Sequence, residues 1–138
     1  QVAGDKLQLN EKDQLKNRTK KFAVDVIKII KNFPKNHIYK SLGNQLLRSA
    51  TSVSADYRTA KKTRSTAEFI AKPGIVAEEI DESKHWFELL AESALIIESS
   101  VPVLYKEADE IAAMYTNQLK QQNAIAINFK SSVIQRLM

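Results

Sequence analysis

The side chains with the clearest potential for chemistry are two histidines and the carboxylates around them in a chain of 138 residues. Helical bundles that hold two metal ions use two Glu-x-x-His pairs, each on one helix face, together with two further glutamates. The sequence contains one such pair, Glu82 with His85, whereas His37 has Pro34 three positions before it. A single pair on an acidic helix is more typical of a solvated surface, so we expect no metal site and no cofactor.

Catalysis has little other support in the sequence. The chain has no cysteine, which excludes a thiol nucleophile, a thiolate zinc site and disulfides, and its three glycines form no phosphate-binding loop. Trp86 could stack on a nucleobase, but an aromatic residue at this spacing is more often a packing residue. We therefore expect a non-enzymatic protein without catalytic residues. A metal-binding bundle enzyme remains the less favoured alternative, because a second Glu-x-x-His pair is missing.

The net charge of +5 hides a strong division along the chain. Residues 1–64 contain 15 Lys and Arg against 5 Asp and Glu, a net charge of +10, whereas residues 65–138 contain 6 against 11, a net charge of −5. Such an asymmetry indicates either that one part binds a polyanion or that basic and acidic surfaces dock on each other.

Four segments with helical spacing of apolar residues must position these charges. The periodic segments cover about residues 11–33, 37–61, 66–98 and 102–121. They are separated by short breaks at Pro34, at Lys62-Thr63-Arg64 and at Ser99-Pro102. Short connections favour antiparallel neighbours, so we predict an all-α protein, an antiparallel up-down-up-down four-helix bundle over residues 11–121, after an irregular segment 1–10.

Two stretches depart from this simple pattern. The helical period fades after Lys120, and residues 124–129 alternate as a strand would, so we predict a C-terminal appendage over residues 122–138. The appendage could be disordered, docked on a neighbouring subunit or foreign to the natural protein. Pro73 lies inside the predicted third helix and predicts a local kink there, either as a hinge or as a tolerated irregularity.

The antiparallel order brings two basic segments to one end of the bundle. The start of the first helix and the end of the second then supply the predicted nucleic-acid-binding residues Lys20, Lys21, Arg58, Lys61, Lys62 and Arg64, with Lys12, Lys16 and Arg18 nearby. No motif for reading bases is visible, so binding would come from phosphate neutralisation. The competing interpretation is a solvated or subunit-facing surface.

The second predicted helix has a slim centre. Small residues occupy positions 49, 50, 52, 54 and 55, which predicts the close approach of a neighbouring helix. Across the turn that follows, residues whose numbers sum to about 127 lie level, which places Arg48 opposite Glu79, with Glu78 and Glu82 within a turn. We predict a structural ion pair between Arg48 and Glu79; a phosphate contact by Arg48 is the weaker alternative.

Residues 46–56, Leu-Leu-Arg-Ser-Ala-Thr-Ser-Val-Ser-Ala-Asp, also resemble the signature of a family of four-helix-bundle proteins encoded in intervening sequences of bacterial large-subunit (23S) rRNA genes. Residues 65–70, 74–76 and 78–79 resemble the family's following segment, and the similarity covers about residues 12–121. Asp56 stands where the family usually has Asn, and Pro73 where an apolar helix former is usual.

The resemblance implies a homo-oligomer, a ring of five bundles, and a role in binding RNA or DNA. A related branch of proteins serves retroelement reverse transcriptases, so the resemblance also implies a protein partner. A pure protein-interaction scaffold is the rival function within the non-enzymatic class. No apolar run approaches the roughly 18 residues of a membrane span, so we expect no membrane association and a bacterial cytoplasmic location.

Overall fold

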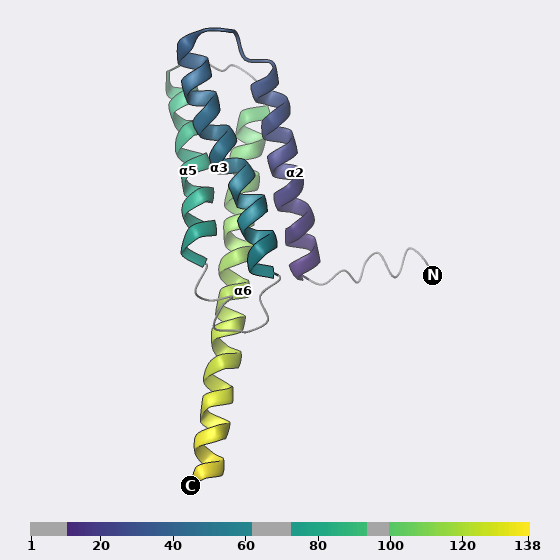
Figure 1. Cartoon of the computed structure of the whole chain (residues 1–138), viewed down its shortest axis with the longest axis vertical. Coiled ribbons are helices and arrows are strands. Elements are labelled where there is room, and N and C mark those ends of the chain that lie inside the picture. The colour runs from purple at the N-terminus through teal and green to yellow at the C-terminus, as the bar shows by residue number, and fades with distance from the viewer. Residues whose placement is uncertain (1–10, 62–72, 94–99) are drawn as a thin grey trace, which may run out of the picture.

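The computed structural model describes residues 11–61, 73–93 and 100–138. These residues form four helices, which carry the labels of Figure 1: α2 (Glu11–Lys31), α3 (His37–Lys61), α5 (Pro73–Glu92) and α6 (Ser100–Leu137).

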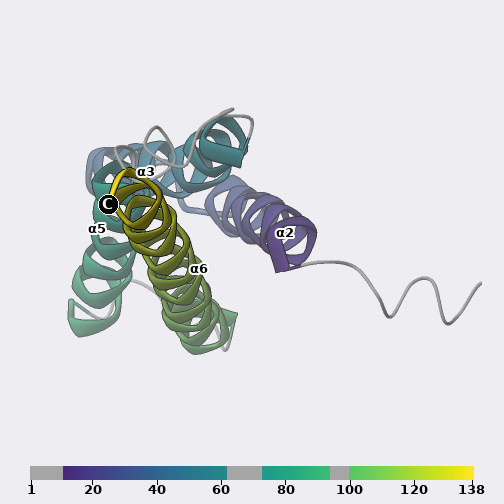
Figure 2. The same cartoon turned by 90° about the horizontal axis from the view of Figure 1, so that it is seen from below.

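The helices form an antiparallel bundle in which each runs opposite to the next (Figures 1 and 2). Contacts join α2 to α3, α3 to α5, α5 to α6 and α6 back to α2, which closes the bundle. The predicted all-α, up-down-up-down architecture is confirmed. The N-terminus of α2, the C-terminus of α3 and the projecting part of α6 lie at one end (Figure 1).

The core is built from the apolar faces that the sequence period predicted. Phe22 and Phe87 meet edge to face with ring centroids 6.4 Å apart, and Tyr57 and Tyr115 meet in the same way at 5.8 Å. Buried aliphatic residues fill the space between them: Leu15, Val26, Ile29, Leu46, Val53, Val76, Ile80, Leu90, Leu104 and Ile111. Burial of these side chains is the main stabilising contribution to the fold.

Local signals explain the ends of α2 and α3. The last turn of α2 tightens after Lys31, where the Phe33 N–H donates to the Ile30 carbonyl at 3.0 Å, and Pro34 prevents continuation. Asn36 is the N-cap of α3, because its Oδ1 accepts hydrogen bonds from the N–H groups of Ile38 at 3.1 Å and Tyr39 at 3.0 Å. The bounds of α3 agree with the prediction.

The third helix differs from the prediction at its C-terminal end. It ends at Glu92 rather than near residue 98, and Ser93 is a turn residue whose hydroxyl donates to the Leu89 carbonyl at 2.6 Å. Serine competes in this way with the regular backbone ladder. Within the described chain α5 begins at Pro73, a residue that suits a first helical turn. The predicted start near residue 66 and the turn before Pro73, where we predicted the kink, lie outside the described residues.

The predicted end of the last helix near residue 121 is wrong, and so is the strand-like interpretation of residues 124–129. Helix α6 continues without a break to Leu137 and projects beyond the other helices (Figure 1). A two-residue alternation cannot specify a strand without a neighbouring strand to pair with, and the sequence after Lys120 contains no helix-breaking Gly or Pro. None of the described helices combines the length and the apolar character of a membrane span.

Candidate nucleic-acid interface

A groove of ≈ 580 Å³ lies between α2 and α3. We call it the phosphate groove. Its rim is formed by three cationic side chains, Lys16 and Lys20 from α2 and Arg58 from α3, and by three hydroxyl residues of α3, Thr51, Ser54 and Thr59. The small side chains of Ala23 and Ala55 complete the lining.

Helical spacing places these side chains on facing surfaces. Lys16 and Lys20 are four residues apart, as are Ser54 and Arg58, so each pair lies on one face of its helix. The short residues Ser54 and Ala55, which belong to the slim part of α3, leave room that longer side chains would fill. The hollow therefore follows from the small residues of α3. Its positive charge comes from the lysines of α2 and from Arg58 of α3.

The cations of the phosphate groove are available to a ligand. Lys16, Lys20 and Arg58 are exposed and form no ion pair within the described part of the chain. The hydroxyls of Thr51 and Thr59 already donate to carbonyls of their own helix, those of Leu47 at 2.7 Å and Ala55 at 3.1 Å. Attraction for an anion therefore comes from the three cations.

The structure divides the predicted nucleic-acid-binding residues. Lys20 and Arg58 lie together in the phosphate groove. Lys21, by contrast, forms an ion pair with Asp25 at 2.7 Å, and the hydrogen bond from Lys21 to Asp25 raises the pKa of Lys21. The side chain of Lys61, and Lys62 and Arg64 entirely, lie outside the described residues. Lys16 was not among the predicted site residues, although its spacing from Lys20 signals a shared face.

Arg18 forms ion pairs with the acidic half of the chain and does not belong to the phosphate groove. Its guanidinium forms ion pairs with Glu107 and Glu110 of α6, the second at 2.6 Å, and its Nη1 lies 3.0 Å from Met114 Sδ. The hydrogen bond to Glu107 is the largest cause of a raised Arg18 pKa. Arg18 thus joins α2 to α6 and is unavailable to an external anion.

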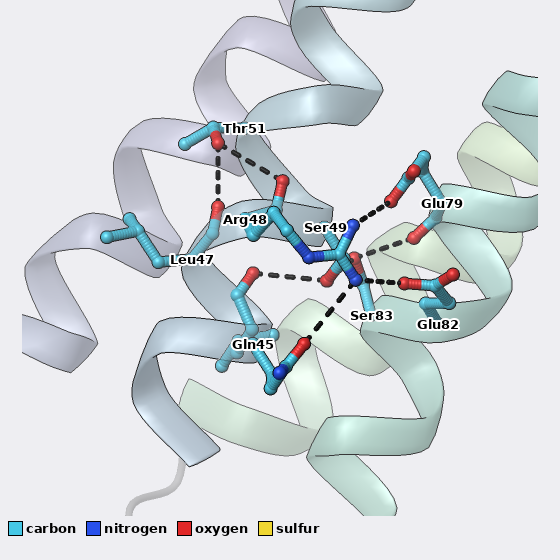
Figure 3. Close-up of polar contacts among 9 residues, drawn as sticks. Gln45, Leu47, Arg48, Ser49, Thr51, Glu79, Glu82 and Ser83 are labelled. Atoms are coloured by element: carbon cyan, nitrogen blue, oxygen red, sulfur yellow. Dashed lines mark hydrogen bonds and ion pairs between the residues drawn. The ribbon is translucent and has the colours of Figure 1, made fainter. Parts of the chain in front are cut away.

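Arg48 lies against the carboxylates of α5, as Figure 3 shows. Its Nη2 is 2.6 Å from Glu82 Oε2, and its Nη1 is 3.6 Å from Glu79 Oε2. Glu82 is therefore the closer partner, one helical turn beyond the predicted one. The Arg48 side chain is 51% exposed, so this cluster is a partly solvated one and not a buried ion pair.

Glu79 is the most buried member of this cluster. Its side chain is 16% exposed, and its Oε2 accepts no hydrogen bond within the described residues. Desolvation, and secondly the nearby charge of Glu82, raise the pKa of Glu79, while Arg48 opposes them. The position of this carboxylate indicates a structural role.

The single Glu-x-x-His pair is engaged in other contacts. Glu82 pairs with Arg48, and the His85 ring lies 5.1 Å from the Trp86 ring in an edge-to-face contact. Within the described ranges no three residues of the metal-binding types lie close enough together to hold an ion.

Comparison with known proteins assigns the chain to a family. The family model for the 23S rRNA-intervening sequence protein matches residues 11–117, and its match ends next to Gln118, the last buried residue of α6. A solved structure from Bacteroides thetaiotaomicron VPI-5482, described as a protein of unknown function from the S23 ribosomal protein family, superposes with a TM-score of 0.74 at 27% identity, over 80% of this chain and 99% of that chain. No curated protein sequence matches. The chain belongs to the 23S rRNA-intervening sequence protein family.

Proposed function

We propose that the protein is a non-enzymatic nucleic-acid-binding protein that holds a phosphate backbone in the phosphate groove. The observation that carries this proposal is the convergence of Lys16, Lys20 and Arg58, all without an ion-pair partner in the described chain, from two helices onto one groove. An oriented set of cations attracts the regularly spaced charges of a nucleic-acid backbone.

The distribution of charge over the bundle supports the same function. Among the described side chains of α2 and α3, nine are Lys or Arg and two, Asp25 and Asp56, are acidic. The described acidic side chains lie mainly on the opposite pair of helices: Glu78, Glu79, Asp81, Glu82, Glu88, Glu92, Glu107, Asp109 and Glu110. The bundle therefore presents a basic face over α2 and α3, which would orient it toward a polyanion.

The residues of the phosphate groove favour recognition of the backbone over recognition of the bases. Among the described residues, the lining includes no aromatic side chain on which a base could stack, and no Asn or Gln that could read a base edge. Contacts from Lys and Arg to phosphate position a nucleic acid but carry no sequence information. We therefore expect weak sequence preference and a strong dependence on salt.

Fluorescence anisotropy with labelled duplex DNA and RNA tests the proposal. The variant Lys20→Glu with Arg58→Glu should lose binding at low salt, while Lys21→Glu with Lys28→Glu, a matched change on exposed lysines outside the phosphate groove, should retain most of it. Circular dichroism verifies that both variants remain helical. Equal loss in both pairs, or no binding by the wild type at low salt, would overturn the proposal.

Assembly with further copies of the chain is a second candidate function, and the projecting part of α6 favours it. Large apolar side chains of this segment are exposed: Ile125 by 55%, Ile127 by 64%, Phe129 by 70%, Ile134 by 58% and Leu137 by 83%. Such an apolar surface is typical of a helix that packs against a partner. Sedimentation of the full chain at micromolar concentration tests this candidate, and a stable monomer would exclude it.

A further inference from the structure

A second groove, of ≈ 650 Å³, lies at the other end of α2 and α3, around their connecting turn. We call it the turn groove. Two aromatic rings, those of Phe33 and Tyr39, and three lysines, Lys31, Lys35 and Lys40, contribute to its lining. It thus differs from the phosphate groove, whose described lining has cations but no aromatic side chain.

The aromatic side of the turn groove is held in place by packing. Phe33 and Tyr39 meet edge to face with centroids 5.4 Å apart, and both are half-buried, so part of each ring remains accessible. Gly43 makes room for this arrangement, because a Cβ at that position would lie 3.3 Å from Phe33 Cδ2. The missing side chain lets the Phe33 ring rest directly against α3.

The charges around these rings are all of one sign. Lys31, Lys35 and Lys40 are exposed and have no ion pair within the described residues, and no acidic residue lines the turn groove. The Asn36 side chain is occupied as the cap of α3. A ligand that matches this lining has a flat aromatic part and an anionic part.

We infer that the turn groove binds an unpaired nucleotide of the same nucleic acid that the phosphate groove holds, and this inference rests on the proposed function. The base contacts the rings of Phe33 and Tyr39, while the adjoining phosphates lie near the lysines. Stacking on aromatic side chains tolerates any base, which agrees with a protein that does not read sequence.

The two grooves lie on the same face of the bundle. Lys40 and Arg58 are eighteen residues apart on α3, which is about five helical turns, and Lys20 and Lys31 are eleven apart on α2, close to three turns. The rise from Lys20 to Lys31 is about 16 Å, which corresponds to roughly five steps of a duplex. A duplex in the phosphate groove can therefore direct an unpaired end toward the turn groove.

The test compares a blunt duplex with the same duplex carrying a single-stranded overhang that contains 2-aminopurine, a base whose fluorescence falls when it stacks. With wild-type protein the overhang should improve affinity about fivefold or more and quench the probe. Tyr39→Leu should remove both effects and leave affinity for the blunt duplex unchanged. Tyr105→Leu, which alters a half-buried tyrosine of α6, is the matched control.

A second variant keeps the inference testable where Tyr39→Leu does not fold. Lys35→Ala with Lys40→Ala changes exposed side chains and should lower the overhang preference, whereas Lys28→Ala with Lys106→Ala should not. An overhang preference that survives both groove variants overturns the inference, as does a wild type without that preference. Free nucleotide that competes as well as the overhang would also overturn it. Blunt-duplex binding decides the proposed function separately, because that measurement does not involve the turn groove.

Discussion

The hydroxyl groups of Ser49 and Ser83 lie 2.9 Å apart in the buried contact between α3 and α5 (Figure 3). Both residues are fully buried, and the Ser49 hydroxyl also bonds to the Leu46 carbonyl at 3.1 Å. Two small side chains facing each other allow a close approach of the two helices. This part of the slim centre of α3 is therefore covered inside the bundle, and it leaves no open surface for another subunit.

Enlarging this contact should destabilise the bundle more than removing its hydrogen bond. Ser83→Leu inserts a large side chain between two closely packed helices and should cost about 1–3 kcal/mol of unfolding free energy. Ser83→Ala removes one hydroxyl, which lies 2.9 Å from both Ser49 Oγ and the Glu79 carbonyl, and should cost about 1 kcal/mol. Urea denaturation of both variants checks the order, and an equal cost would show that the helices are not closely packed at Ser49.

The exposure of Arg48 changes the expected effect of its removal. Exposed ion pairs contribute little to stability, so Arg48→Ala should lower the melting temperature at neutral pH by less than the loss of a buried ion pair would. Lys40→Ala, an exposed lysine of α3 without an ion pair in the described chain, is the control and should change stability little. Thermal melting of both variants provides the comparison.

The same variant should reveal the raised pKa of Glu79. The folded state holds the Glu79 proton more tightly than the unfolded chain does, because the pKa of this carboxyl is raised above its ordinary value of 4.5. The stability that Glu79 contributes is therefore largest below that value and is lost as the pH rises through its folded pKa. Arg48→Ala raises the Glu79 pKa further, so its destabilisation should be larger at about pH 7 than at about pH 4. A pH-independent difference from wild type would contradict this.

The sequence was a good guide to the fold because each helix carries its own apolar stripe. The bounds of α3 and the cap at Asn36 follow from local signals, and so does burial of Val53 and Tyr57. Whether a cation has an ion-pair partner depends on the residues that share its helix face, and not on the apolar stripe. Lys20 and Lys21 are neighbours in sequence, yet Asp25 neutralises Lys21 alone, because a residue four positions away shares its helix face.

Long-range positions explain the remaining differences. Residue spacing alone places Arg18 with the other cations at the start of α2. Its partners Glu107 and Glu110 are distant in sequence, so the ion pairs could not be predicted from spacing. Arg48 lies nearer to Glu82 than to Glu79 because α3 and α5 pack at a level different from the one that the count gives, with Ser49 against Ser83 rather than against Glu78. Such an offset is not encoded in a count from the turn.

Breaking the link between α2 and α6 should destabilise the bundle moderately. Arg18→Met keeps much of the packing of the side chain but leaves Glu107 and Glu110 without their shared cation, so repulsion between the carboxylates adds to the lost hydrogen bonds. We expect a cost of about 1–2 kcal/mol in a urea titration at neutral pH. Adding Glu107→Gln should recover part of this loss, and the absence of any recovery would argue against a shared ion cluster.

Removing the end of α6 separates folding from assembly. A chain that stops after Gln121 loses mostly exposed side chains, so its melting temperature as a monomer should change by only a few degrees. If the exposed apolar residues Phe129 and Ile134 join copies of the chain, the shortened protein should sediment at a lower mass than the full chain. Equal masses for the two proteins would exclude this segment as the site of assembly.

Salt dependence of nucleic-acid binding should distinguish Lys20 from Lys21. The phosphate groove offers three cations, so the logarithm of the binding constant for duplex DNA should fall against the logarithm of salt concentration with a slope of about −2.7 or steeper. Lys20→Ala removes one contact and should reduce the slope by about 0.9. Lys21→Ala removes the same charge one residue away but should leave the slope unchanged, because that lysine is paired with Asp25.

The comparison is strict because both variants have the same net charge and the same change in side-chain size. A general effect of charge would lower the slope equally in both proteins, whereas a localised site lowers it only in Lys20→Ala. Anisotropy titrations of one duplex at a series of salt concentrations measure both slopes with the same probe. Equal slopes for the two variants would show that the nucleic acid does not contact Lys20, and the phosphate groove would then have no role in binding.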